Sequence, residues 1–143
     1  MPNSEALLLL DTHIWIWLMN GDEKLASPRL LKIIQERSDR KALRVSVISV
    51  WEVGMLESKK RIMLPYSCHE WVHRALNIPG LALVPLGADI ALESTRLPDT
   101  FHGDPADRIL VATAAHLGAE LVTQDERIHA YLKKNPIVHA IAP

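Results

Sequence analysis

The sequence predicts an α/β fold in which helices flank both faces of a mostly parallel sheet. Short apolar runs alternate along the chain with longer amphipathic stretches. The first run, LLLL, shows no polar alternation, which is typical of a strand covered on both faces. Strands that are separated by helical segments are joined by right-handed crossovers, and such crossovers produce parallel pairing.

Each element has its own local signal. β-Branched and leucine-rich composition indicates the strands, and Ser27 with Pro28 offers a helix N-cap followed by an N1 proline. Gly118 closes the longest helix. The expected strands are Leu7–Leu10, Arg44–Ile48, Leu81–Val84, Glu120–Thr123 and Ile137–Ile141. The expected helices cover Ile14–Met19, a segment from Pro28, one from Ser49, one from Ser67, Ala88–Arg96, Pro105–Leu117 and Glu126–Leu132.

Length and composition predict one globular domain over residues 1–143. Hydrophobic residues make up 48% and charged residues 23%, and 16 basic against 17 acidic residues give a net charge of −1. The single Cys68 excludes an internal disulfide and fits a reducing compartment. No basic residue precedes the apolar run Ala6–Leu10 and Asp11 ends it, so we expect neither a signal peptide nor a membrane span, and a cytoplasmic protein.

Acidic residues follow several of the predicted strands. Asp11 and Asp125 come just after strands, Glu52 follows another by four residues, and Asp104 and Asp107 open the long helix. In a parallel sheet the ligand crevice lies beyond the carboxyl ends of the strands, so these side chains should meet there. Clustered carboxylates repel one another unless a cation is present, and Mg²⁺ takes oxygen ligands of this kind. The pattern therefore predicts a metal site.

Each of these acids also has a simpler explanation as a helix-capping residue. SVWE, Ser49 to Glu52, has the capping-box form, and DPAD places Asp104 at an N-cap and Asp107 at the N3 position. Asp11 and Asp125 are also suited to start helices. Capping alone does not explain why all of the acids fall at one predicted edge.

Two other site types fit the sequence less well. HEWVH, with His69, Glu70 and His73, matches the zinc-protease pattern, but it lies in a peripheral amphipathic helix without an evident third ligand. SCHE before it predicts a capping box in which Ser67 is the cap. A phosphoacceptor receiver domain needs adjacent acids after the first strand, where this chain has Asp-Thr-His.

The segments LLLLDTHIWIWL, ISVWEVGML and HGDPADRILVATAAHLGAELVTQDE, in this order, resemble the PIN-domain family, and most closely its VapC-type toxins of bacterial toxin–antitoxin pairs. The resemblance spans nearly the whole chain. It implies a PIN-like, Rossmann-like parallel sheet and an endoribonuclease that depends on Mg²⁺ or Mn²⁺. By motif, Asp11, Glu52, Asp107 and Asp125 correspond to the family's acidic quartet. Asp104 belongs to the DPADR variant and is either a further metal ligand or only a cap.

The resemblance also implies partners, namely an RNA substrate, a cognate antitoxin protein and a second copy of the chain in a homodimer. An arginine or lysine of the antitoxin would pair with the acidic cluster. Core packing accounts for most of the large apolar side chains, but a partner groove or dimer face would use the same types. The apolar candidates are Ile14, Trp15, Trp17, Leu18, Met19, Trp51, Met55 and Leu56. The candidates for phosphate contacts are Arg37, Arg40, Lys41, Arg44, Lys59, Lys60 and Arg61.

Overall fold

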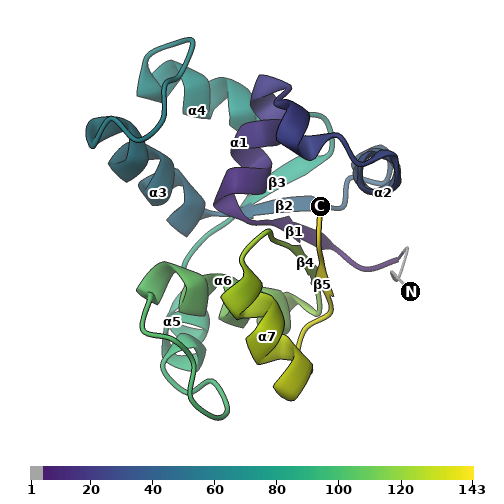
Figure 1. Ribbon diagram of the computed structural model, residues 1–143, viewed down its shortest axis with the longest axis vertical. Helices are drawn as coiled ribbons and strands as arrows, with labels where there is room; N and C mark the ends of the chain where they lie inside the picture. The colour runs from purple at the N-terminus through teal and green to yellow at the C-terminus, as the bar shows by residue number, and fades with distance from the viewer. Residues whose placement is uncertain (1–4) are drawn as a thin grey trace.

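The computed structural model describes residues 5–143 and contains a five-stranded, wholly parallel sheet (Figure 1). The strands are β1 (Leu8–Leu10), β2 (Leu43–Ser46), β3 (Leu81–Val84), β4 (Glu120–Val122) and β5 (Ala140–Ile141). Their order across the sheet is β3-β2-β1-β4-β5. The predicted α/β architecture is confirmed.

The helices cover both faces of this sheet, as predicted. One face carries α1 (Thr12–Asn20), η1 (Glu23–Leu25), α2 (Pro28–Asp39), α3 (Val47–Ser58) and α4 (Cys68–Leu76). The other carries α5 (Ala88–Ser94), α6 (Pro105–Leu117) and α7 (Glu126–Lys134). All three residues of β1 are buried, because helices pack above and below it. None of the described helices is long and apolar enough to cross a bilayer.

Local capping explains most helix starts. Ser27 accepts a hydrogen bond from the Leu30 amide at 3.3 Å at the start of α2, and Pro28 occupies the first turn. Ser67 caps α4 in the same way through the Glu70 amide. Gly118 ends α6 with φ of 61°, a conformation that glycine adopts without steric cost.

The boundary between β2 and α3 differs from the prediction. The strand ends at Ser46 and not at Ile48, and Ser46 is the N-cap of α3, accepting from the Ile48 amide at 3.1 Å. β2 pairs with β3 only as far as Ser46. Because the ladder ends there, the following β-branched residues are free to enter the helix. Ser49, expected to be the cap, lies inside α3 with its side chain fully buried.

The strand order creates a switch point between β1 and β4. The chain builds outward from β1 through β2 to β3, then returns to place β4 and β5 on the other side of β1. Crossovers leave the two neighbouring strands in opposite directions at such a point, which opens a crevice at their carboxyl ends. Asp11 follows β1 directly, and Asp125 comes three residues after the end of β4.

A buried ion pair lies at the opposite edge of the sheet, where β4 begins. Arg37 of α2 is only 1% exposed, and its guanidinium lies 2.7 Å from Glu120. It also donates to the Ala6 carbonyl, while His139 contacts the second Glu120 oxygen at 2.5 Å. The predicted phosphate contact of Arg37 is therefore wrong, because the Arg37 guanidinium is buried and paired with Glu120.

Candidate metal centre

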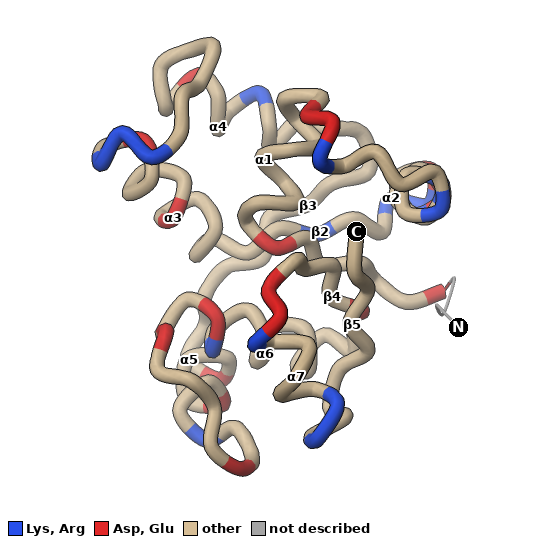
Figure 2. Tube along the Cα trace, in the orientation of Figure 1, with Lys and Arg blue, Asp and Glu red and all other residues tan. Residues whose placement is uncertain are grey.

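Four helices begin at the carboxyl edge of the sheet, and each carries an acidic residue at its cap or within its first two turns (Figure 2). Asp11, Asp104 and Asp125 are the N-caps of α1, α6 and α7, and Asp107 lies in the first turn of α6. Glu52 lies in the second turn of α3. Helix N-termini carry partial positive charge, so they partly offset the repulsion among these carboxylates. Acids at this edge of the sheet therefore both cap helices and lie in one cluster.

Asp11 is the most enclosed of the five acids. Its residue is 7% exposed, and the Thr123 hydroxyl donates to its Oδ2 at 2.6 Å while the Thr12 amide donates to Oδ1 at 2.6 Å. Burial raises the pKa of this carboxyl above its ordinary value, although both hydrogen bonds and the nearby His13 act in the opposite direction. A cation would therefore stabilise the ionised form.

Glu52 points back from α3 toward the end of β1. The Thr12 hydroxyl donates to its Oε1 at 2.5 Å and lies 2.8 Å from the buried Ser49 hydroxyl. Burial, helped by the charges of Asp11 and Asp107 and opposed by the Thr12 hydrogen bond, raises the pKa of Glu52 to about 7. The capping-box explanation for Glu52 is wrong, because Ser46 is the cap and Glu52 is joined to α1.

Asp107 and Asp125 face one another near a histidine and an arginine side chain. His102 Nε2 lies 2.7 Å from Asp107 Oδ2, and Arg127 lies 3.7 Å from the same oxygen and 3.3 Å from Asp125 Oδ2. Burial raises the pKa of Asp107, with the His102 hydrogen bond opposing. Burial also raises the pKa of Asp125, but hydrogen bonds from Arg127 and the Ile128 amide outweigh it, so the net shift is downward.

Asp104 is exposed and caps α6. Its Oδ1 accepts from the amides of Ala106 at 2.9 Å and Asp107 at 3.4 Å, so the predicted capping role is confirmed. Its charge also raises the pKa of both Glu52 and Asp107. The Asp104 carboxylate therefore adds to the negative electrostatic potential of the acidic cluster.

The residues at this edge fit a divalent cation. Ligand atoms from His102, Asp107 and Asp125 all lie within 4.8 Å of one another. Asp11 adds to the same negative potential, since its charge raises the pKa of Asp107. Carboxylate oxygens are the ligands that Mg²⁺ and Mn²⁺ prefer, and buried carboxylates with raised pKa values gain most from a bound positive charge.

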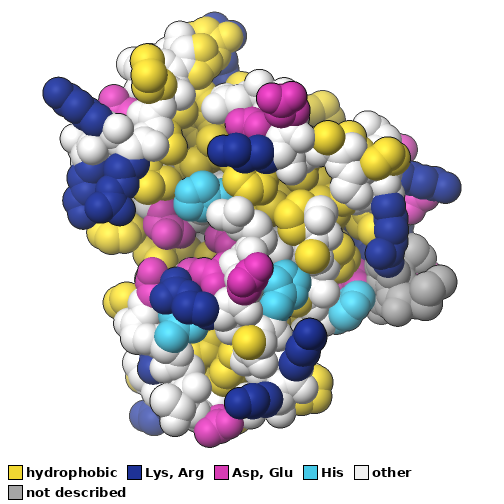
Figure 3. Space-filling view, in the orientation of Figure 1, with side chains coloured by type: hydrophobic (Ala, Val, Ile, Leu, Met, Phe, Trp, Pro, Cys, Tyr) yellow, Lys and Arg dark blue, Asp and Glu magenta, His cyan; other side chains and the backbone are white. Residues whose placement is uncertain are grey.

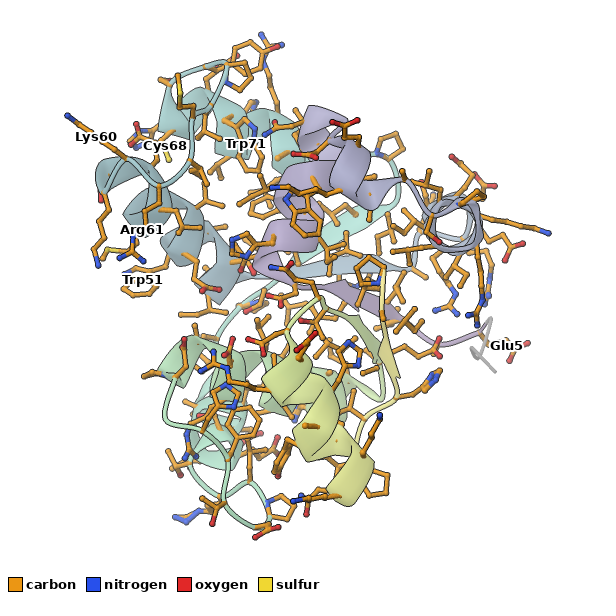
Figure 4. The ribbon with its side chains drawn as sticks, in the orientation of Figure 1. Glu5, Trp51, Lys60, Arg61, Cys68 and Trp71 are labelled. Atoms are coloured by element: carbon orange, nitrogen blue, oxygen red, sulfur yellow. The ribbon has the colours of Figure 1, made fainter. Side chains whose placement is uncertain are left out.

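A groove of about 650 Å³ adjoins the acidic edge. Its walls come from α3 and from the start of α6, and Glu52 and Asp104 lie among its lining residues. Trp51 lines it with 57% of its surface exposed, and Lys59 and Arg61 lie at its basic end. Figure 3 shows the basic side chains over the end of α3, and Figure 4 shows Trp51 and Arg61 close together there. The groove thus joins an aromatic and basic surface to the acids.

The apolar candidates divide between core and surface. Ile14 and Trp15 are fully buried, with Trp15 packed edge-on against Trp71 at 5.1 Å, so they belong to the core. Met55 and Leu56 are partly buried and line the groove with Trp51. Trp17, Leu18 and Met19 are partly buried as well, and Trp51, Met55 and Leu56 are the candidates that line the groove beside the acids.

HEWVH does not form a comparable centre. His69 and His73 are exposed on α4, and Glu70 pairs with Arg74 at 2.8 Å. Among residues 5–143, the one group of three or more metal-ligating side chains in ligand geometry is that of His102, Asp107 and Asp125. The motif match is an accident of helical spacing.

We expect Glu70→Gln to leave unchanged the RNA cleavage that the sequence resemblance implies, and to lower the free energy of unfolding by at most about 1 kcal/mol, because it removes only an exposed pair and a weak capping contribution. Urea denaturation and an RNA cleavage assay measure both quantities. Loss of activity together with zinc in elemental analysis would revive the protease interpretation.

We expect the metal-free protein to lose stability as the pH rises through neutrality. Glu52, with a pKa of about 7 against 4.5 in an unfolded chain, binds its proton more tightly in the folded state. The unfolded state then holds fewer protons between these values, so the free energy of unfolding falls as the pH rises from about 5 to about 7.5. Asp11 and Asp107 act in the same direction.

Thermal unfolding in a chelator at several pH values tests this dependence. Glu52→Gln should flatten the profile, because the amide does not titrate. Parallel profiles for the two proteins would show that Glu52 ionises normally.

Three groups at this edge were not predicted from the sequence. His102 and Arg127 bind the acids of α6 and α7, and Ser49 supports the Thr12 hydroxyl. His102 begins the HGDPADR segment, five residues before Asp107, and this spacing is the one sequence signal that could have drawn attention to it.

Comparison with known proteins agrees with this geometry. The PIN domain matches residues 8–134. Ribonuclease VapC22 of Mycobacterium tuberculosis is 31% identical over 131 residues, which cover 91% of this chain and 95% of the relative. Among solved structures, a chain of the DNA-bound VapBC of Salmonella typhimurium superposes with a TM-score of 0.67 at 15% identity, covering 96% of this chain and 98% of its own.

A chain of VapBC2 from Rickettsia felis, bound to a promoter DNA fragment, gives a TM-score of 0.64 at 16% identity over 95% of this chain and 98% of its own. At these identities the structural matches establish the fold. The family match spans β1 to β4 and every acid of the centre, and the curated relative covers 91% of the chain. The chain belongs to the PIN-domain family.

Proposed function

We propose that this protein is a metal-dependent endoribonuclease and the toxin of a toxin–antitoxin pair. The observation that carries the proposal is the convergence of Asp11, Glu52, Asp107 and Asp125 at the switch point of the sheet. The relationship to a ribonuclease of the VapC type supports RNA as the substrate. Residues 1–143 are proposed to act as one nuclease domain.

Asp11, Asp107 and Asp125 are proposed as metal ligands, with Asp104 as a further one through the carboxylate that also caps α6. Either Mg²⁺ or Mn²⁺ suits such oxygen donors. A bound ion of this kind supplies Lewis-acid stabilisation of charge on a phosphodiester. The protein's own contribution is to hold the carboxylates in place, which Thr12 and Thr123 do through hydrogen bonds to Asp11.

Glu52 is proposed as the proton acceptor for the attacking water. A general base works best when its pKa lies near the working pH, and burial places the pKa of Glu52 at about 7. The Thr12 hydroxyl of α1 donates to this carboxylate and also contacts the buried Ser49 hydroxyl of α3, which holds Glu52 in position. The role therefore falls to Glu52 and not to Asp125, whose pKa is lowered and whose oxygens cap α7.

The groove beside the acids is proposed to hold single-stranded RNA. An exposed aromatic ring next to basic side chains is the combination that proteins use for single strands, with bases on the ring and phosphates on the cations. Trp51 supplies the ring, and Lys59 and Arg61 supply the charge. Arg40, Lys41 and Arg44 lie where β2 begins, at the opposite edge of the sheet from the acids, and are not part of this path.

A cognate antitoxin is proposed as the restraining partner, since the solved structures that match this fold are complexes of the VapBC kind. Its basic side chain would pair with the carboxylates, as Arg127 does within this chain. Met55, Leu56 and Trp51 offer the adjoining apolar surface. A homodimer remains part of the proposal.

The test is cleavage of total RNA by purified protein with Mg²⁺, with Mn²⁺ and with a chelator. We expect cleavage only with metal, and inhibition when the small protein encoded beside the toxin is co-expressed. Binding without cleavage under every metal condition would support a non-catalytic PIN-fold binding module instead. A monomer by light scattering that stays fully active with the co-expressed protein would refute the partner proposal.

A further inference from the structure

His102 lies in the loop before α6, with its imidazole turned toward the acidic centre. The side chain is 19% exposed, and Nε2 lies 2.7 Å from Asp107 Oδ2. One ring nitrogen of His102 and one carboxylate oxygen each from Asp107 and Asp125 lie within 4.8 Å of one another. The imidazole is the one nitrogen ligand in this group among residues 5–143.

Packing holds this ring in its position. The imidazole stacks on Phe101 with ring centroids 4.2 Å apart and planes 26° apart. Phe101 is 4% exposed and meets Tyr131 edge-on at 4.6 Å, and Arg108 donates to its carbonyl at 3.1 Å. A ring fixed in this way loses little side-chain entropy on binding a ligand.

The geometry suits coordination of a cation. Ligand atoms around Mg²⁺ or Mn²⁺ lie at about 2.1 Å from the ion, so two of them on opposite sides are about 4.2 Å apart. The spread of 4.8 Å for His102, Asp107 and Asp125 is close to that value.

We infer that His102 Nε2 is a direct ligand of the divalent cation in this centre, and that it makes the centre favour Mn²⁺ over Mg²⁺. The inference rests on the proposed function. Carboxylates alone serve Mg²⁺ and Mn²⁺ alike, whereas an imidazole nitrogen is a better ligand for transition-metal ions than for Mg²⁺. The single nitrogen donor therefore sets the choice of metal.

Pulsed electron paramagnetic resonance of Mn²⁺ bound to the full-length protein, without RNA, tests the assignment. A directly bound imidazole produces ¹⁴N modulation of the Mn²⁺ signal. We expect this modulation in the wild type and its loss in His102→Gln, in which an amide keeps a hydrogen bond to Asp107. His129→Gln is the matched control, because His129 Nε2 bonds the Thr123 carbonyl at 2.7 Å and lies outside the ligand group.

Calorimetric titration of the same variants with each metal gives a second readout. His102→Gln should weaken Mn²⁺ binding by about tenfold or more and Mg²⁺ binding by less than about threefold, so that the preference is lost. His129→Gln should change neither.

The outcomes separate the two proposals. Bound Mn²⁺ without ¹⁴N modulation in the wild type, or modulation that survives in His102→Gln, overturns the role of His102 and leaves the nuclease proposal standing. Failure of the wild type to bind Mn²⁺ overturns the role of His102, and failure to bind both Mn²⁺ and Mg²⁺ overturns both proposals. The wild-type spectrum decides the matter even where His102→Gln folds poorly.

Discussion

Asp11→Asn and Asp107→Asn are each expected to lower the rate of RNA cleavage by more than about 100-fold. Loss of a group that only orients a ligand typically costs 10- to 100-fold in metal affinity or activity, so loss of a ligand should cost at least as much. Both substitutions keep the size of the side chain and remove one negative charge.

The same two variants should remain folded. Burial already raises the pKa of both carboxyls, so a neutral amide avoids the cost of desolvating a charge. We expect Asp107→Asn to be as stable as the wild type or slightly more stable in a chelator, and Asp11→Asn to lie within about 1 kcal/mol of it because its hydrogen bonds rearrange.

Single-turnover cleavage and urea denaturation measure these effects. Asp39→Asn is the control, because Asp39 is exposed at the end of α2, where its carboxylate accepts a hydrogen bond from Gln35. Wild-type cleavage by either site variant would show that the acid is a capping residue and not a ligand.

Arg37→Met is expected to lower the free energy of unfolding by about 3 kcal/mol, the lower end of the range for breaking a buried ion pair. Its guanidinium is 2.7 Å from Glu120 and also holds the Ala6 carbonyl. The expected decrease in the free energy of unfolding stays at the lower end of this range, because His139 still hydrogen-bonds Glu120 after Arg37 is replaced. Nuclease activity of the folded fraction should be unchanged, since this pair lies at the edge of the sheet away from the acids.

Urea denaturation at neutral pH measures the loss, and Arg40→Met, the same change three residues further along at an exposed position, should have little effect. Replacing both partners in Arg37→Met/Glu120→Met should recover part of the stability, because no buried charge is then left beside an apolar group. An Arg37→Met protein as stable as the wild type would show that the pair contributes nothing net.

The order of helices and strands was accessible from the sequence because local signals specify it. The LLLL run predicted a strand buried on both faces, and β1 is fully buried. The DPAD segment predicted the start of α6, with Asp104 as its cap. Parallel topology alone then placed Asp11 and Asp125 at one edge, which the structure confirms.

The end of β2 depended on pairing that the local sequence does not contain. RVSVI suits a strand throughout, but β3 offers partners only as far as Ser46, so the helix begins there. Ser49 then turns inward to the Thr12 hydroxyl, and Glu52 joins α1. A two-residue difference in one boundary decided whether Glu52 is a cap or a member of the centre.

The sequence by itself determined the fold class, most of the helix caps and the edge at which the acids gather, because capping, apolar periodicity and parallel crossovers act over short stretches of chain. Only the tertiary structure placed the Arg37 charge against Glu120, 83 residues away, and left Trp51 exposed beside the acids. It also aimed the ring of His102 at Asp107 by stacking it on the buried Phe101. Such contacts depend on which surfaces meet when the elements pack, and that information is distributed over the whole chain.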